Sequence, residues 1–422
     1  MVSKNKKLTS RVGNERLGIN ENKKHKTKKM SNVEKEKKIK KENRINNNEK
    51  RIKNNKKNKK VKRTKKRKIQ DGGFNKEKTV CAPYMVQSGL TGKGLNSINK
   101  EENGKMILVE KGKKVEVIPT VHPDSCMGHN ELMAIINAWN ASYGNDDKKR
   151  INKQGDKGLV KGDDKLWEEL RKKIDIHITQ LKDEGEHEWW EQDFVKQKLG
   201  IGKLSAIQDS IYAPEAPESW KESPNTWLNT IDIEDVLNQY EKKYPEFKSF
   251  GASPIDFDLV GSDGSCQVNP LCNISMDKLM KGEGYGGNKK QYVGVVFNLD
   301  KHYESGSHWI ALFVNIPKGE INFWDSYGLT PPKEVVDLMD KIKGQLESSE
   351  LFKGLINGIN SKKVKIQVND VRHQYKNSEC GVYSLHFIIK QLEGKNYNQV
   401  CNNKLSDDEM NEYRQKFFTN AK

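Results

Sequence analysis

Four residues in the last third of the chain have the types and the order that suit nucleophilic catalysis: His308, Asp325, Gln374 and Cys380. Cys380 directly precedes the apolar run 381–389, which we expect to form a buried helix. A helix N-terminus carries about half a positive charge, which stabilises a thiolate and lowers the pKa of a thiol. Most lone cysteines are nevertheless small buried hydrophobes, so Cys380 does not establish a nucleophile by itself.

The histidine and the aspartate belong to one predicted hairpin. His308 begins the apolar strand 309–316, where an imidazole adds nothing to a core, and Asp325 ends the return strand 321–325. The start of one strand lies beside the end of the next, so both side chains belong at one sheet edge. There the imidazole can take the thiol proton while the carboxylate orients the ring. The register stays open, because a turn centred on Lys318 leaves Asp325 a few residues from His308 unless a bulge intervenes.

Gln374 lies six residues before Cys380, in a loop between a predicted strand and a helix. Its side-chain amide and the backbone N–H of Cys380 are donors of the kind that stabilise a developing oxyanion. An exposed loop glutamine is the commoner interpretation of such a residue. The joint order of histidine, aspartate, glutamine and cysteine makes an active site the better hypothesis.

A mixed sheet flanked by helices is needed to position these residues. Two runs, 292–299 and 309–316, are apolar on both faces, which is typical of central strands. We expect strands at 292–299, 309–316, 321–325 and 363–368, and helices at 331–343, 381–389 and 406–418. Ser406 and Glu409 form a capping-box pattern at the last helix. The pattern predicts an α+β catalytic domain over residues 251–422.

Residues 76–250 predict a helical accessory domain. Apolar residues recur at helical spacing over 129–139, 166–181, 187–199 and 233–244. Ser125 is the expected N-cap of the first helix, and 212–224 is an expected loop. Six of the eight tryptophans lie here, and we expect them in a packed core: Trp139, Trp167, Trp189, Trp190, Trp220 and Trp227.

Three short motifs resemble those of the Ulp1/adenain-type cysteine proteases, over roughly residues 290–395. They are Gly306-Ser307-His308-Trp309, Phe323-Trp324-Asp325-Ser326, and Gln374 with Glu379-Cys380-Gly381. This family includes SUMO-specific peptidases, the adenoviral maturation protease and thiol proteases of large nucleocytoplasmic DNA viruses. Three further segments resemble the helical arm region of the large-virus members: Cys81-Ala82-Pro83-Tyr84, Ala138-Trp139-Asn140 and Ser253-Pro254-Ile255-Asp256-Phe257-Asp258.

The resemblance implies a papain-like, Ulp1-like fold with four roles: nucleophile for Cys380, general base for His308, orienter for Asp325 and oxyanion donor for Gln374. It also implies that Trp309 binds substrate by walling a channel that admits a Gly-Gly-like segment, since any Cβ would block such a tunnel. Many eukaryotic members have aspartate before the nucleophile. Glu379 stands there in this chain and favours the viral branch. No metal or other cofactor is expected.

Several functions fit this resemblance. The first is an endopeptidase that cuts viral structural precursors after Gly-Gly-like sites during virion maturation. The alternative is an isopeptidase that removes SUMO or ubiquitin-like proteins from host conjugates. An acyltransferase on a related fold is disfavoured by the intact Trp309 and Gln374. A catalytically dead binding module is disfavoured because all four catalytic groups are present.

The net charge of +18 is concentrated in the N-terminal tail. Residues 1–70 hold 29 Lys+Arg and 6 Asp+Glu, a net charge of +23, whereas the remainder has a net charge of −5. So polar a segment cannot bury enough apolar surface to fold, so we expect residues 1–75 to be disordered. The densest basic stretch, 56–68, suits contact with DNA or RNA or nuclear import, and a solvated low-complexity extension explains it equally well. Protein substrates remain the expected partners.

Other patterns bear on location and metal binding. No apolar run reaches the roughly 18 residues of a membrane span, and the first residues have no apolar signal region. We therefore expect an intracellular protein. The resemblance to the large-virus proteases implies the host cytoplasm, virus factory and virion, and the basic tail makes the nucleus a further expected location. The six cysteines have no paired spacing, which favours free thiols in a reducing compartment, and the absence of any CxxC disfavours a structural zinc site. Cys126 and His129 have C-x-x-H spacing, but two further ligands are missing.

Overall fold

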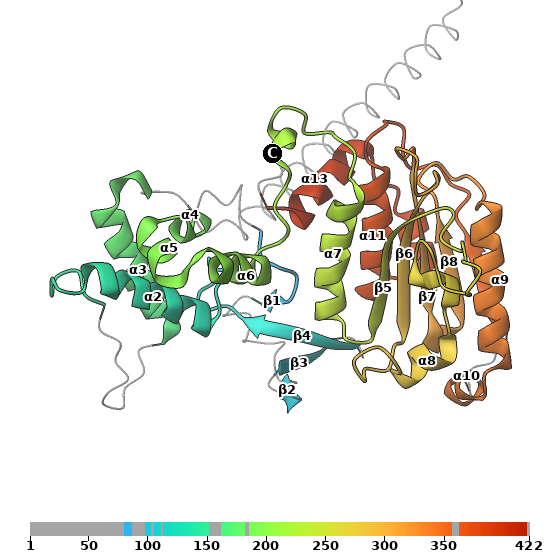
Figure 1. The fold of residues 1–422 in the computed structure, drawn as a ribbon, viewed down its shortest axis with the longest axis horizontal. Helices are drawn as coiled ribbons and strands as arrows, with labels where there is room; N and C mark the ends of the chain where they lie inside the picture. Colours follow the sequence, from blue (N-terminus) through green and yellow to red (C-terminus); the bar gives the residue numbers. More distant parts are fainter. Residues whose placement is uncertain are drawn as a thin grey trace, which may run out of the picture. The chain divides into compact units, whose positions relative to one another are not determined.

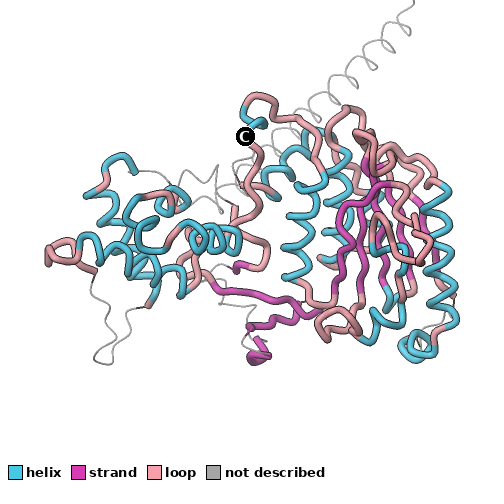
Figure 2. Tube along the Cα trace, in the orientation of Figure 1, coloured by secondary structure: helices cyan, strands magenta, loops and turns pink. Residues whose placement is uncertain are grey.

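The computed structural model describes residues 80–86, 98–102, 105–110, 113–151, 162–181, 185–356 and 363–419. The tail predicted to be disordered, 1–75, and its basic stretch, 56–68, lie outside these residues. Figure 2 shows helices (cyan) in both parts of the described chain, and a group of neighbouring strands (magenta) in its C-terminal part.

A five-stranded mixed sheet forms the centre of the catalytic region (Figure 1). Its strands, in spatial order, are β5 (Phe247–Pro254), β6 (Tyr292–Asn298), β7 (Trp309–Asn315), β8 (Glu320–Trp324) and β9 (Lys365–Val368). The three inner strands run antiparallel, and each outer strand is parallel to its neighbour. The four predicted strands are confirmed. β5 was not predicted, and the expected domain boundary at residue 250 falls inside it.

Helices cover both faces of this sheet, and strand alternation separates the two cores. Ala311 and Phe313 of β7 pack on one side, against α7 (Thr230–Lys243), α11 (Cys380–Leu392) and α13 (Asp407–Phe417). Ile310 and Leu312 pack on the other, against α8 (Met276–Lys281), α9 (Lys333–Ser348) and α10 (Glu350–Leu355). The three predicted helices correspond to α9, α11 and α13, and α12 (Tyr397–Asn402) was not predicted. The predicted capping box at Ser406 is confirmed, since its backbone N–H donates to the Glu409 carboxylate over 3.0 Å.

The helices of the accessory region pack around a separate apolar cluster. They are α2 (His129–Tyr143), α3 (Asp163–His177), α4 (His187–Trp190), α5 (Asp193–Leu199) and α6 (Ile201–Ile211). Ser125 was expected to cap α2, but Gly128 occupies the N-cap, and the Ser125 hydroxyl donates to Glu186 over 2.7 Å. Trp227 was expected in the core, yet 43% of it is exposed.

The accessory region also contains a four-stranded sheet that the sequence did not predict. Its strands are β1 (Met85–Val86), β4 (Lys113–Pro119), β3 (Lys105–Glu110) and β2 (Ile98–Glu102), in spatial order. Val115 and Val117 of β4 are buried in the same cluster as Leu237 of α7. Alternate residues of β4 therefore pack in the apolar cluster that contains α7, a period-two signal that the helical interpretation overlooked.

Four of the six cysteines form disulfides, so the prediction of six free thiols is wrong for those four. Cys81 pairs with Cys126, and Cys266 pairs with Cys272, with Cα–Cα distances of 5.2 and 5.8 Å. The first pair is separated by 45 residues, and such a pairing leaves no local spacing pattern in the sequence. Cys380 and Cys401 are free and buried.

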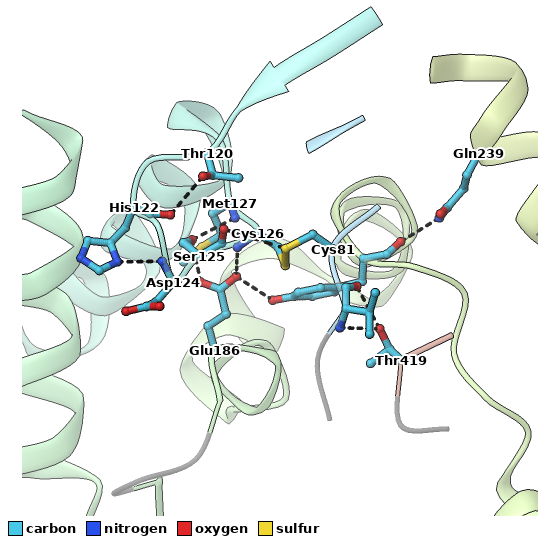
Figure 3. The surroundings of a disulfide bond; sticks show 12 residues. Cys81, Thr120, His122, Asp124, Ser125, Cys126, Met127, Glu186, Gln239 and Thr419 are labelled. Carbon is cyan, nitrogen blue, oxygen red and sulfur yellow. Dashed lines mark hydrogen bonds between the residues drawn. A yellow bond between two sulfur atoms is a disulfide. The ribbon is translucent and has the colours of Figure 1, made fainter. Parts of the chain in front are cut away.

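The first disulfide adjoins a buried carboxylate, as Figure 3 shows. Glu186 accepts hydrogen bonds from the Ser125 hydroxyl and the Cys126 backbone N–H, over 2.7 and 2.6 Å. The Trp167 indole and the Tyr212 hydroxyl also donate to it, over 3.2 and 3.4 Å. Burial raises the pKa of Glu186, and these hydrogen bonds oppose that rise. A carboxylate with neutral donors alone thus lies at the centre of the accessory region.

A short segment next to Cys81 links the accessory region to the catalytic region. The Val80 carbonyl accepts from the Ala213 N–H over 2.7 Å, and the Val80 N–H donates to the Thr419 hydroxyl over 3.1 Å. The Tyr212 carbonyl accepts from the Gln239 side chain of α7 over 2.7 Å. Figure 3 shows the hydrogen bonds made by Thr419 and Gln239.

The described part of the chain has no helix that is long and apolar enough to cross a membrane. Nor does it contain a group of three or more His, Cys, Asp or Glu residues arranged to hold a metal ion. The Cys126 sulfur of the C-x-x-H pair is taken up by a disulfide, and His129 instead pairs with Asp163 over 3.0 Å.

Candidate active site

Cys380 is the first residue of α11, whose residues are all buried except Lys390. The helix begins where the chain leaves a polar loop, with Glu379 as the N-cap residue. Gly381 lies against Leu228, where a Cβ would come within 3.0 Å of the leucine Cβ. Glycine therefore lets the helix start approach the segment before α7 closely. The cysteine itself is only 1% exposed.

His308, just before β7, and Asp325, just after β8, lie together at the open end of this hairpin, as their order in the sequence predicts. The His308 Nε2 is 2.8 Å from the Asp325 Oδ1, and both residues are buried. The register pairs Ala311 with Trp324, so one step further Asp325 lies opposite Ile310. His308 and Asp325 are thus diagonal cross-strand neighbours. The 3₁₀ turn Ile316–Lys318 and the residue after it set this register, which the sequence left open.

The surroundings of His308 favour its protonated form. Burial alone lowers the pKa of His308, but hydrogen bonds to Asp325 and Cys380, together with the charges of both, raise it to about 9. Because Nε2 bonds the carboxylate, Nδ1 is the nitrogen left for the thiol. Surroundings that stabilise the imidazolium favour transfer of the Cys380 thiol proton to the neutral imidazole of His308.

Gln374 is fully buried, and its side-chain amide has a fixed orientation. The Ser326 hydroxyl donates to the Gln374 Oε1 over 2.6 Å, and the Gln374 Nε2 donates to the Lys376 carbonyl over 2.8 Å. The backbone N–H of Gln374 also donates to the Ser326 carbonyl, over 2.9 Å. The amide nitrogen is thereby directed toward the segment that leads to Cys380. Its part in an oxyanion hole stays a prediction.

Trp309 lies on the side of the site formed by the segment before α7. Its indole N–H donates to the Leu228 carbonyl over 2.8 Å, and its ring packs in the same apolar cluster as Cys380. Leu228 therefore contacts both Trp309 and Gly381. The exposed Trp227 is the preceding residue, so an aromatic ring open to solvent adjoins this group.

Arg414 is a buried cation near the nucleophile that the sequence did not single out. Its guanidinium donates to the carbonyls of Thr226 and Ser378, over 2.6 and 3.3 Å, and lies 4.5 Å from the Trp220 ring centroid. Burial lowers the pKa of Arg414, and the nearby Glu379 opposes that shift. Arg414 thus connects the loop just before Cys380, through Ser378, to the segment before α7, through Thr226. Nothing in its place on an amphipathic helix marks this role in the sequence.

Residues 288–422 match the family described as the Ulp1 protease family, C-terminal catalytic domain. The matched range contains all four residues of the candidate site. It also contains the inner strands of the sheet and the buried helix α11.

Two curated viral proteins are similar to longer parts of the chain. A protein of Acanthamoeba polyphaga mimivirus, named as a thiol protease, is 37% identical over 194 residues, which cover 46% of this chain and 57% of that protein. A protein of African swine fever virus, named as a SUMO-1 cysteine protease, is 28% identical over 238 residues, covering 53% of this chain and 77% of that protein. The chain therefore spans little more than half the length of the mimivirus relative.

Two solved structures are also similar to parts of the chain. A crystal structure of the African swine fever virus protease has a TM-score of 0.47 at 25% identity, covering 63% of this chain and 93% of that one. The C-terminal Ulp1 protease domain in complex with Smt3, the yeast ortholog of SUMO, has a TM-score of 0.32 at 16% identity, covering 46% and 76%.

Proposed function

Because residues 288–422 match the Ulp1 protease family, we propose that this protein is a cysteine endopeptidase that cleaves after Gly-Gly-like sites. One observation carries the proposal. The buried His308 contacts Asp325 over 2.8 Å and Cys380 at the start of α11, and the pKa of the imidazole is raised to about 9.

The proposed reaction follows from these contacts. The Cys380 thiolate attacks the scissile carbonyl, and the Gln374 amide and the Cys380 N–H stabilise the oxyanion. The His308 imidazolium then protonates the departing amine, which leaves a thioester on Cys380. The neutral imidazole next takes a proton from water, which attacks the thioester, and Asp325 holds the ring throughout.

Burial of the nucleophile supports the preference for glycine. Cys380 is 1% exposed, and Trp309 and Leu228 pack beside it. A substrate must therefore thread a narrow passage to bring its carbonyl to the sulfur. Glycine has no Cβ and needs the least room there.

Processing of viral structural precursors is the substrate class that we favour. The similarity to the African swine fever virus protein covers 53% of this chain, which is more than the catalytic residues 251–422 can supply, so it reaches into the accessory region. A catalytic domain alone does not distinguish precursors from conjugates. The shared accessory region favours the viral proteases, and with them a site of action in the host cytoplasm, virus factory and virion.

The test uses two activity probes on the full chain: a short peptide ending in a Gly-Gly vinyl sulfone, and SUMO with the same reactive end. We expect the peptide probe to label wild type and Cys401→Ala but not Cys380→Ala. Cys401 is the other free buried cysteine, so its variant controls for labelling elsewhere. Labelling by the SUMO probe alone supports the isopeptidase alternative. Absence of labelling by both probes, with the protein folded, contradicts the proposed function.

Contact between the basic tail and nucleic acid is a separate proposal, supported by the net charge of +23 in residues 1–70. A tail that binds packaged DNA raises the local concentration of the protease near DNA-bound precursors. Deletion of residues 1–70 is expected to weaken binding to a DNA duplex at low salt. Unchanged binding contradicts the proposal.

A further inference from the structure

The ring of Tyr327 lies against the imidazole of His308. The two ring centroids are 4.6 Å apart, and the ring planes differ by 19°, which is a stacked arrangement. The backbone N–H of Tyr327 donates to the Asp325 Oδ1 over 2.8 Å. This is the same carboxylate oxygen that bonds His308. Tyr327 therefore contacts both His308 and Asp325, the first through its ring and the second through its backbone N–H.

Arg372 connects the Tyr327 ring to the loop that carries Gln374. Its guanidinium carbon lies 5.2 Å from the Tyr327 ring centroid, within the range of a cation–π contact. Its Nε donates to the Gln374 carbonyl over 2.7 Å. A chain of direct contacts thus runs from His308 through Tyr327 and Arg372 to the backbone of Gln374.

The turn after Asp325 brings these groups together. Gly328 has a φ of +71°, and a Cβ there would lie 2.8 Å from the Val371 carbonyl carbon and 2.9 Å from the Arg372 nitrogen. Only glycine lets the backbone of this turn lie against residues 371–372. The contact between Tyr327 and Arg372 therefore depends on backbone packing and is not a chance approach of two surface side chains.

A stacked ring supplies a constraint that Asp325 does not. One hydrogen bond to Nε2 fixes one atom of the imidazole but leaves the ring free to tilt about that bond. A flat neighbour on the face of the ring fixes its plane, and with it the direction of the second nitrogen. Misplacement of a catalytic group by about 1 Å costs on the order of 10²-fold in rate.

We propose that Tyr327, held by Arg372, is a positioning residue that sets the plane of the His308 ring and so directs its second nitrogen at Cys380. The inference rests on the proposed function and adds a residue to that site. The stack requires an aromatic ring and does not require the phenolic hydroxyl.

The test compares Tyr327→Leu with Tyr327→Phe in the full chain. Alkylation of Cys380 by iodoacetamide is followed from pH 5 to 10 by peptide mass spectrometry, which requires no knowledge of the substrate. We expect Tyr327→Leu to lower the alkylation rate near pH 6 on the order of tenfold, because fewer molecules hold the thiolate–imidazolium pair. Tyr327→Phe is expected to restore the wild-type profile.

Two controls separate positioning from a loss of structure. Cys401 is free, and burial raises the pKa of its thiol to about 11, so it should stay unmodified near pH 6 in every folded variant. Peptide cleavage should show a lower kcat with little change in KM for Tyr327→Leu. The Cys380 alkylation rate of Arg372→Met near pH 6 should lie between the rates of Tyr327→Leu and wild type. The rate of Arg372→Lys should be nearer to that of wild type.

Three results decide the matter. A Tyr327→Leu profile equal to that of wild type overturns the inference, as does a Tyr327→Phe variant as slow as Tyr327→Leu. Wild type that shows no enhanced Cys380 alkylation near pH 6 contradicts the proposed function itself. The two failures are therefore distinguishable in one experiment.

Discussion

The catalytic region and the accessory region each bury a carboxylate, and the two differ in their partners. Asp325 bonds an imidazole that can gain or lose a proton, and the pKa of that imidazole is raised to about 9. Glu186 bonds a hydroxyl, a backbone N–H, an indole and a phenol, none of which carries a positive charge. Burial therefore raises the pKa of Glu186 itself.

This difference separates a chemical site from a structural one. Burial and several hydrogen bonds are common to both, so neither identifies an active site. What distinguishes Asp325 is a titratable partner that in turn contacts a nucleophile. Glu186 instead holds four donors from three segments of chain, which is the task of a structural group. Substitutions of Asp325 should therefore lower the reaction rate, and substitutions of Glu186 should lower the free energy of unfolding.

Asp325→Ala should show the largest effect, a loss on the order of 10³-fold in kcat/KM with little change in Tm. Without the carboxylate, burial lowers the pKa of His308 from about 9, so the imidazolium is lost at lower pH. The basic limb of the pH–rate profile should move from near pH 9 toward neutral pH. An unmoved limb would mean that His308 is not the group that protonates the leaving amine.

Removal of the Cys81–Cys126 disulfide should be the largest effect in the accessory region. The double change Cys81→Ser and Cys126→Ser opens a loop of 45 residues and should cost up to about 4 kcal/mol of unfolding free energy. The Cys266–Cys272 pair closes only a short loop, so the matching double change should cost about 2 kcal/mol. Chemical denaturation measures both. Equal costs would indicate that loop entropy does not set the difference.

Glu186→Gln should cost about 2 kcal/mol, because an amide N–H₂ would face donors where the carboxylate oxygen accepts. The pH dependence has a definite sign. A carboxyl whose pKa is higher in the folded state than in the unfolded state stabilises the fold at low pH, and the benefit declines as pH rises above about 4.5. Denaturation at several pH values should show that decline in wild type and a flatter curve in Glu186→Gln. Equal slopes would contradict the assignment of this proton to Glu186.

Ser326→Ala should show the smallest effect, a roughly tenfold loss in kcat. The change leaves the buried Gln374 Oε1 without its hydroxyl donor and frees the amide to turn. Gln374→Ala is the matched variant, with an expected loss of about 10²-fold. A loss in kcat for Ser326→Ala as large as that for Gln374→Ala would mean that Ser326 contacts the reacting atoms itself and does not act only by orienting Gln374.

Sequence patterns predicted the parts of the site that depend on order along the chain. A hairpin implies that His308 and Asp325 meet, and an apolar run after Cys380 implies a buried helix. The register between His308 and Asp325 depends on a 3₁₀ turn whose geometry the sequence did not fix. Tyr327 and Arg372 were missed because their contact depends on how closely two loops approach at Gly328.

The accessory region was harder to predict for a similar reason. Its helices show clear periodicity, whereas the Cys81–Cys126 pair joins segments that are far apart in sequence. β4 contributes two buried valines to a core formed by other parts of the chain, so its pattern is short and weak. No sequence pattern separates Trp227 from the buried tryptophans, although it is 43% exposed in the segment before the Asn229 N-cap.

The hydrogen bond between Val80 and Thr419 has a consequence for synthesis in the cell. These residues are 339 positions apart, and Thr419 also pairs with Pro214 and Ala216. A ribosome that adds roughly 5–20 residues per second releases Val80 many seconds before Thr419 exists. The accessory helices can fold during that interval, but the join to the catalytic region can close only after α13 has emerged. Truncation before residue 419 should therefore leave two folded regions that lack the hydrogen bonds of Thr419 to Val80, Pro214 and Ala216.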